Sequence, residues 1–242
     1  MIDFPVWLVA LVGALLASTV TTITSIGAGM IMYGALGPLL GLKVVIPLVA
    51  PAQLLAVALR CWLFRRHLRW RLAALFFIGV VPGIFAGALL FELLTETALR
   101  RTMGVFLLSF AVYETWRGNE NPVQRHLVLL PLGGLAAGAL LGSIGIAGPL
   151  LAVIFLRYGL LKEDLIAMVA LFFLLGNAQR TVLYWQQGFF VDDRLALAIG
   201  MGLAMLVGVY AGRQVLPYIS GELFRRLVLG MLILFGLQFL FW

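Results

Sequence analysis

Long apolar runs separated by short polar breaks dominate the chain. Two of the runs, residues 4–42 and 127–156, carry no charged residue. As single helices they would be roughly 58 and 45 Å long, against about 30 Å of bilayer hydrocarbon. Both have glycines near the centre, in SIGAG at residues 25–29 and in GSIGIAG at residues 142–148. We therefore predict that each run forms two shorter helices joined by an unwound turn that contains glycine.

The remaining apolar segments are each about long enough for one membrane span. They lie at residues 44–64, 72–91, 102–116, 165–184, 195–211 and 227–242, with a polar linker at 117–126 and a loop expected at 213–226. Runs of this length and the lack of strand-like alternation indicate an all-α polytopic membrane protein with about 8–10 membrane segments.

Four short sequence matches recur in the same order in both halves of the chain. Ser25-Ile-Gly matches Ser143-Ile-Gly at an offset of 118, and Arg60-x-x-Leu-Phe matches Arg180-x-x-Leu-Tyr at 120. Gly83-Ile-Phe-Ala-Gly matches Gly208-Val-Tyr-Ala-Gly, and Leu99-Arg-Arg matches Phe224-Arg-Arg, both at 125. We predict a duplication, with residues 1–120 as the first transmembrane repeat and 121–242 as the second, in a single transmembrane domain.

The charges in the loops predict how the repeats lie in the membrane. Residues 65–71 are strongly basic and are expected in the cytoplasm, whereas their counterpart at 186–193 has no Lys or Arg and is expected outside. The two halves would then be inverted-topology repeats of five crossings each, with both termini outside. Re-entrant hairpins would give the same loop sides, and Lys43 and Arg100/Arg101 are misfits on the outside.

Composition excludes several classes of protein. The chain is 63% hydrophobic and 11% charged, with a mean hydropathy of +1.10, so a soluble domain is excluded. The net charge of +7 is explained by membrane orientation, and no nucleic-acid partner is expected. No enzyme motif is visible, the single Cys61 allows no internal disulfide, and no carboxylate lies well inside a span. We expect neither enzyme activity, cofactor nor metal site.

The two glycine turns are the strongest candidates for a substrate site. Broken helices at matching positions of two repeats are typical of transporter sites, and helix N-termini there bind anions. The candidate substrate-binding residues of the turns are Thr24, Ser25, Gly27, Gly29, Ser143, Gly145 and Gly148. The alternative interpretation is that the glycines only permit close helix crossing.

Four polar residues inside the spans complete the candidate site. Arg60 and Arg180 lie at matched positions, where they either attract substrate or extend to the membrane interface. Gln53 and Asn177 lie closer to mid-span, where they either bind substrate or hydrogen-bond between helices.

At these residues the chain resembles the TauE/SafE family of bacterial sulfite exporters over nearly its whole length. The resemblance rests on SIGAG, LFRRHLRWRLA and VPGIFAGALL in the first half. In the second half it rests on GSIGIAG, ALFFLLGNAQRTVLYWQQGFF and VGVYAGRQVLPYISGELFRRLVLGMLILFGL. It implies export of small sulfur-containing or organic anions, such as sulfite or sulfoacetate, across the bacterial inner membrane. The chain departs from many members in its less glycine-rich first turn and in Pro149 after Gly148.

The sequence thus predicts a secondary transporter that exports a small anion across the bacterial cytoplasmic membrane. A passive channel for small solutes and a membrane-embedded assembly subunit are the alternatives. The expected partners are the anionic substrate, the lipid bilayer and a second copy of the chain in a homodimer.

Overall fold

The computed structural model describes residues 3–24, 26–117, 127–160, 162–190 and 193–242, and this part of the chain is helical without strands. Its α-helices are α1 (Phe4–Thr24), α2 (Ala28–Leu40), α3 (Leu42–Leu63), α4 (Trp70–Leu93), α5 (Glu96–Arg117), α6 (Leu130–Ile144), α7 (Gly148–Arg157), α8 (Lys162–Gln186), α9 (Asp193–Val215) and α10 (Gly221–Phe241). Three short 3-10 helices are η1 (Arg65–His67), η2 (Leu127–Leu129) and η3 (Leu216–Tyr218). The predicted all-α class is confirmed.

Six of the described helical segments are long and apolar enough to cross a membrane. They are α1, α3, α4, residues 127–144 of η2 and α6, residues 163–186 of α8, and residues 193–218 of α9 and η3. The shorter apolar helices are α2, α7 and residues 226–241 of α10. Large apolar side chains such as Leu89 and Val207 are exposed on the outer faces of these helices, as expected where a protein contacts lipid. The chain is therefore a multi-pass membrane protein.

Both overlong runs are interrupted at the glycine motifs. α1 ends at Thr24 and α2 begins at Ala28, while α6 ends at Ile144 and α7 begins at Gly148. Gly27 has φ +118° and Gly145 has φ +72°, backbone conformations that favour glycine. α2 and α7 have 13 and 10 residues, so they cover only about two thirds and about half of the hydrocarbon thickness. Ser25 lies outside the described residues.

Two expected boundaries were wrong, because polar caps start helices earlier than the apolar pattern does. α5 begins at Glu96 rather than at residue 102, since Thr95 Oγ1 accepts a hydrogen bond of 3.2 Å from the Ala98 amide. The expected loop at 213–226 is mostly helical. There α9 continues to Val215, and Ser220 caps α10 by accepting a bond of 3.2 Å from the Leu223 amide.

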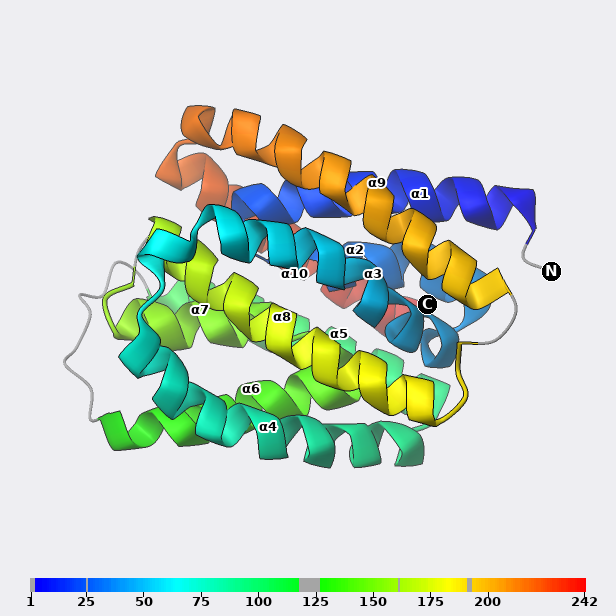
Figure 1. The fold of residues 1–242 in the computed structure, drawn as a ribbon, viewed down its shortest axis with the longest axis horizontal. Helices are drawn as coiled ribbons and strands as arrows, with labels where there is room; N and C mark the ends of the chain where they lie inside the picture. The colour runs from blue at the N-terminus through cyan, green and yellow to red at the C-terminus, as the bar shows by residue number, and fades with distance from the viewer. Residues whose placement is uncertain (1–2, 25, 118–126, 161, 191–192) are drawn as a thin grey trace.

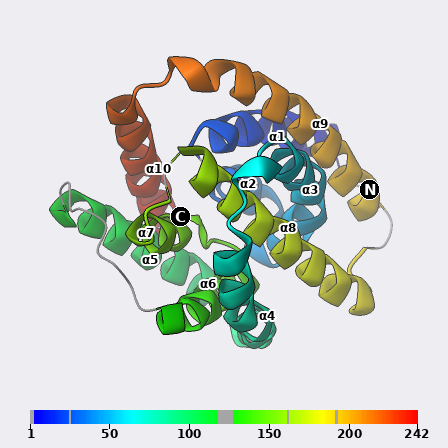
Figure 2. The same cartoon turned by 60° about the vertical axis from the view of Figure 1, so that its left-hand side comes forward.

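The main packing partner of each long helix belongs to the other half of the chain. α1 packs on α9, α4 on α6, α3 on α8 and α5 on α10 (Figures 1 and 2). In chain order, α1, α3, α4 and α5 of the first half correspond to α6, α8, α9 and α10 of the second. Exchanging corresponding helices turns the α1–α9 pair into the α4–α6 pair and leaves the α3–α8 and α5–α10 pairs unchanged. α1 and α6 run in opposite directions along the long axis of the molecule, as do α4 and α9 (Figure 1).

Glycines allow α4 and α6 to cross with their backbones in contact. Gly79, Gly83 and Gly87 of α4 face Gly134, Gly138 and Gly142 of α6. A Cβ atom added to any of the six would lie 1.8–2.4 Å from a backbone carbonyl oxygen of the other helix. Such distances are far below van der Waals contact, so at this crossing the glycines are packing residues.

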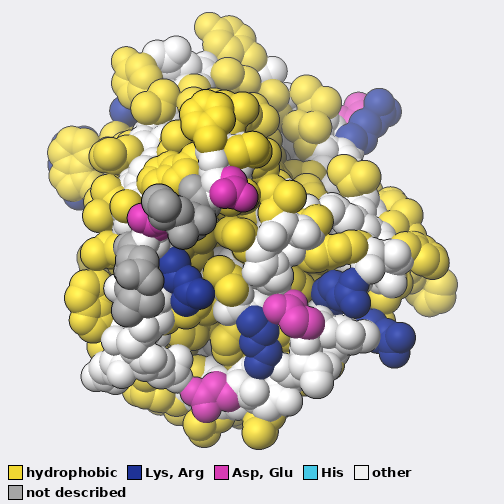
Figure 3. All heavy atoms as spheres, turned by 90° about the vertical axis from the view of Figure 1, so that its right-hand side faces the viewer, with side chains coloured by type: hydrophobic (Ala, Val, Ile, Leu, Met, Phe, Trp, Pro, Cys, Tyr) yellow, Lys and Arg dark blue, Asp and Glu magenta, His cyan; other side chains and the backbone are white. Residues whose placement is uncertain are grey.

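The two ends of the molecule differ in charge. At the end that we call the basic end, residues 65–71 lie beside the start of α8, where Arg69 forms a salt bridge of 2.8 Å with Asp164. At the opposite end, acidic and basic side chains are interspersed (Figure 3). There Glu96 accepts hydrogen bonds from the first amides of α3, and Lys43 donates to carbonyls at the end of α4.

Candidate functional site

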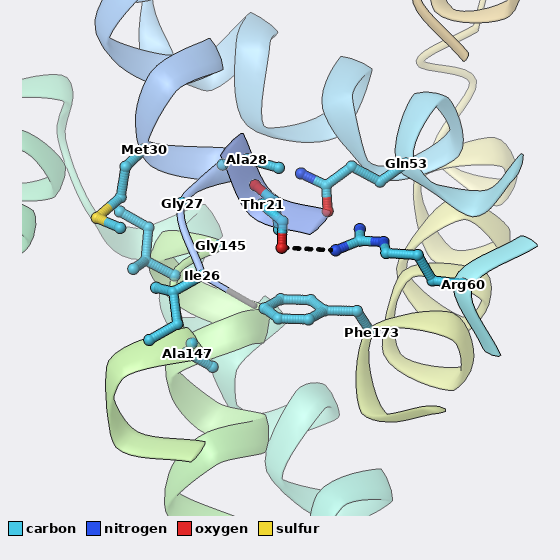
Figure 4. Close-up of a pocket in the computed structure, with 13 residues that line it drawn as sticks. Thr21, Ile26, Gly27, Ala28, Met30, Gln53, Arg60, Gly145, Ala147 and Phe173 are labelled. Atoms are coloured by element: carbon cyan, nitrogen blue, oxygen red, sulfur yellow. Dashed lines mark hydrogen bonds between the residues drawn. The ribbon is translucent and has the colours of Figure 1, made fainter. Parts of the chain in front are cut away.

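A small cavity lies where the two helix breaks meet (Figure 4). Its volume is about 20 Å³, enough for about one water molecule. The lining comes from both breaks and from α1, α3 and α8. It consists of Thr21, Ile26, Gly27, Ala28, Gly29, Met30, Gln53, Arg60, Gly145, Ile146, Ala147, Gly148 and Phe173. The lining contains a cation and no carboxylate, so its charge suits an anion.

The starts of α2 and α7 both form part of the cavity wall. The first amide groups of a helix have no carbonyl partner within it, and the helix dipole makes this end positive. Gly29 and Gly148 lie in these first turns, and neither has a side chain to cover the backbone. Pro149 at the second position of α7 is compatible with a helix start, because a backbone N–H at that position would have no carbonyl partner within the helix. The starts of α2 and α7 therefore both direct positive potential into the cavity.

Among the described residues that line the cavity, Arg60 is the only charged one. Its side chain is 4% exposed, so it does not extend to the membrane interface, and that alternative is wrong. Its Nη1 donates to the Thr21 carbonyl oxygen at the long distance of 3.5 Å, and its Nε has no hydrogen-bond partner within the described part of the chain. A buried guanidinium with donors to spare is costly without an anionic partner.

Arg180, the sequence counterpart of Arg60, lies in a polar network outside the cavity lining. It is 1% exposed, so it too does not reach the interface. Its guanidinium donates to Asn177 Oδ1 at 3.4 Å, to the Ile46 carbonyl at 3.4 Å and to Tyr184 Oη at 3.5 Å. All three partners are neutral. The two arginines are thus buried in different surroundings.

Gln53 and Asn177 connect the cavity to this network. Asn177 Nδ2 donates to Gln53 Oε1 at 3.0 Å, which joins α8 to α3. Gln53 lines the cavity on the same side as Arg60 (Figure 4), seven residues away on α3. Tyr33 of α2 donates to the Gly145 carbonyl at 3.3 Å and so joins the two breaks directly.

The other predicted site residues fall into two groups. Gly27, Gly29, Gly145 and Gly148 line the cavity. The hydroxyls of Thr24 and Ser143 instead donate to nearby carbonyls: Thr24 to Ile26 at 2.6 Å, and Ser143 to Ala139 at 2.6 Å. A role of these residues in substrate binding stays a prediction.

Sequence reasoning missed several lining residues, and one of them had a signal. Phe173 follows Gln53 by 120 residues, the same offset that separates Arg60 from Arg180. Aligning the two halves of the chain around Gln53 would therefore have found it. Ile26, Ile146 and Ala147 are apolar residues within the turns, and their types alone give no sign that they line a cavity.

Substitution of Asn177 by alanine tests the connection between α3 and α8. The change removes the 3.0 Å bond to Gln53 and one bond of Arg180, so we expect a loss of about 1 kcal/mol of stability. Reversible unfolding in mixed micelles measures this. The control is Gln179→Ala on the same helix, whose bond to the Val81 carbonyl is exposed. If Asn177→Ala and Gln179→Ala lowered stability equally, the buried network would not contribute to the stability of the protein.

Two comparisons with known proteins match most of the chain. The family model described as "Sulfite exporter TauE/SafE" matches residues 9–239. A curated protein of Cupriavidus necator, "Probable sulfite/organosulfonate exporter TauE", is 28% identical over 224 residues, covering 89% of this chain and 86% of that protein. No solved structure matches the chain significantly.

Proposed function

This chain belongs to the sulfite exporter TauE/SafE family, and we propose that it exports a small sulfur oxyanion, either sulfite or an organosulfonate. The observation that carries the proposal is the cavity at the helix breaks, where the Nε of the buried Arg60 has no hydrogen-bond partner among the described residues. The name of the relative from Cupriavidus necator agrees with this substrate class. The chain is a multi-pass protein of the bacterial cytoplasmic membrane.

The anion lies between the starts of α2 and α7 in this proposal. Backbone amides of the two first turns donate to its oxygens, Arg60 neutralises its charge, and Gln53 donates one further hydrogen bond. A guanidinium presents parallel N–H groups that match two oxygens of a sulfonate, as they do for carboxylate and phosphate. Thr24, Ser143, Asn177 and Arg180 act one contact further away in this arrangement.

The basic end faces the cytoplasm, and the two halves are inverted repeats. The positive-inside rule supports the orientation, because residues 65–71 and the last residues of α7 lie at that end. The opposite directions of α1 and α6, and of α4 and α9, support the inverted relation (Figure 1). Arg60 then lies on the cytoplasmic side of the breaks and Arg180 on the outer side, since α3 ends at the basic end and α8 begins there.

Transport requires the cavity to enlarge. At about 20 Å³ it admits about one water molecule, so an oxyanion enters only when the surrounding helices separate. Separation on the Arg60 side opens the site to the cytoplasm, and separation on the Arg180 side opens it outward. An inside-negative potential favours exit of an anion by about 2.3 kcal/mol per charge per 100 mV, so uniport suffices energetically.

The proposal is tested with purified protein in liposomes. We expect labelled sulfite or sulfoacetate to be taken up against an internal pool of the same anion, with little uptake against sulfate or simple carboxylates. This exchange distinguishes a carrier from a passive channel, which gives no counterflow. If none of the sulfur oxyanions is exchanged or bound, the export proposal fails and the assembly-subunit alternative gains support.

A further inference from the structure

A second cleft runs between α5 and α7, and it shares no lining residue with the cavity at the helix breaks. Its volume is about 470 Å³. One face of each helix lines it, at the i, i+3/i+4, i+7 spacing of a helical stripe. From α5 the stripe is Phe106, Ser109, Phe110 and Tyr113, and from α7 it is Leu150, Val153, Ile154 and Arg157. The cleft therefore follows both helices for about 10 Å.

The corresponding place in the other half of the molecule is filled. There α10 lies directly on α2: Gln238 Nε2 donates to the Gly34 carbonyl at 2.8 Å, and Cβ atoms added to Gly34 and Gly37 would lie 2.6 and 2.7 Å from Phe235 and Trp242. At the repeat offset of 125, Phe235 and Gln238 correspond to Phe110 and Tyr113 of the cleft. Equivalent positions thus pack on a helix in one half and border open space in the other.

The cleft is ordered from apolar to polar along its length. Phe106 and Leu150 lie at one end, and Tyr113 and Arg157 at the other, where Arg157 Nη2 donates to Tyr113 Oη at 2.8 Å. Arg157 is the last residue of α7, at the basic end of the molecule. Tyr113 is a neutral partner, so this bond leaves the positive charge of Arg157 available to an anion.

We propose that this cleft binds an anionic phospholipid. One acyl chain lies along Phe106, Phe110 and Ile154, and the phosphate contacts Arg157 and Tyr113 at the membrane surface. A lipid matches both the order of polarity and the sign of the charge, because basic groups between membrane helices attract anionic headgroups. The site does not depend on which anion the protein transports.

Lipid binding to the purified, delipidated protein tests this proposal. The probes are phosphatidylglycerol and phosphatidylcholine of the same acyl chains, and the readouts are bound lipids and oligomeric state by native mass spectrometry and the shift in Tm. We expect phosphatidylglycerol to bind more tightly. Arg157→Gln should weaken its binding about fivefold and remove the preference. Arg66→Gln, an exposed arginine at the same end, should leave it unchanged.

Two further variants separate the parts of the site. Ile154→Trp fills the cleft and should lower binding of both lipids. Tyr113→Phe removes one hydroxyl, with its bond to Arg157 and its contact with the phosphate, but it keeps the positive charge and should retain the preference. A preference that survives Arg157→Gln overturns the proposal, as does binding that is insensitive to Ile154→Trp. A dimer that Ile154→Trp dissociates, without any lipid preference, would assign the cleft to a second copy of the chain instead.

Discussion

Replacing Arg60 by glutamine is expected to abolish export while leaving the protein folded. The change removes the one charged group found in the described part of the cavity lining at the helix breaks. Loss of charge-assisted hydrogen bonds worth about 3 kcal/mol weakens anion binding about 100-fold. Flux assays in liposomes and calorimetric titration with sulfite measure the two effects.

The stability of the same variant separates a role in transport from one in folding. Arg60 has a single long hydrogen bond and an unpaired Nε, so it contributes little to the fold of the empty protein. We therefore expect the Tm of Arg60→Gln without substrate to equal or exceed that of the wild type. Arg60→Lys keeps the charge without the planar fork and should give intermediate binding. Normal flux in Arg60→Gln would show that Arg60 does not bind the substrate.

Replacing Gly138 by leucine is expected to abolish the folded protein. A Cβ atom at this position would lie 2.4 Å from the Val80 carbonyl oxygen, which belongs to the backbone of α4 and has no rotamer to adopt. To make room for the side chain, α4 and α6 must separate along the whole glycine crossing, which lowers the stability of the protein by about 3 kcal/mol or more. Size-exclusion chromatography and the yield of monodisperse protein are the measurements.

The matched control for Gly138 is Gly230 of α10. It is also a helical glycine, but a Cβ atom added there meets nothing within 4 Å. Gly230→Leu should therefore behave like the wild type, since both helix propensity and membrane hydrophobicity favour leucine. Wild-type yield and Tm for Gly138→Leu would show that α4 and α6 do not cross with their backbones in contact.

The class of fold and the helix breaks followed from physical constraints that are local in sequence. An uncharged run of 39 residues with glycine near its centre does not form one straight span, and the structure interrupts it between Thr24 and Ala28. The family followed from the order and spacing of motifs, and the family model confirms it. The start of α5 was missed because Thr95, a hydroxyl cap, acts before the apolar pattern begins.

The details of the site depend on contacts between distant segments, which the sequence does not display. Arg60 and Arg180 occupy matched positions and were equivalent in sequence. In the structure only Arg60 lines the cavity, whereas Arg180 is held by Asn177 and Tyr184. Snorkelling was a reasonable alternative for both, because each lies towards one end of its helix, and it was wrong because neighbouring helices cover them. Burial of this kind is decided by tertiary packing.

The pairing of helices across the two halves has a consequence for synthesis of the protein. α1 packs on α9, with Ser18 Oγ bonded to the Met205 carbonyl at 2.7 Å and Gly208 close to the Leu15 carbonyl. α9 emerges from the ribosome roughly 170 residues after α1, a delay of roughly 10 to 30 s at ordinary elongation rates. During that time the small-residue face of α1 has no partner from its own chain. The nascent first half is therefore a natural client for membrane chaperones.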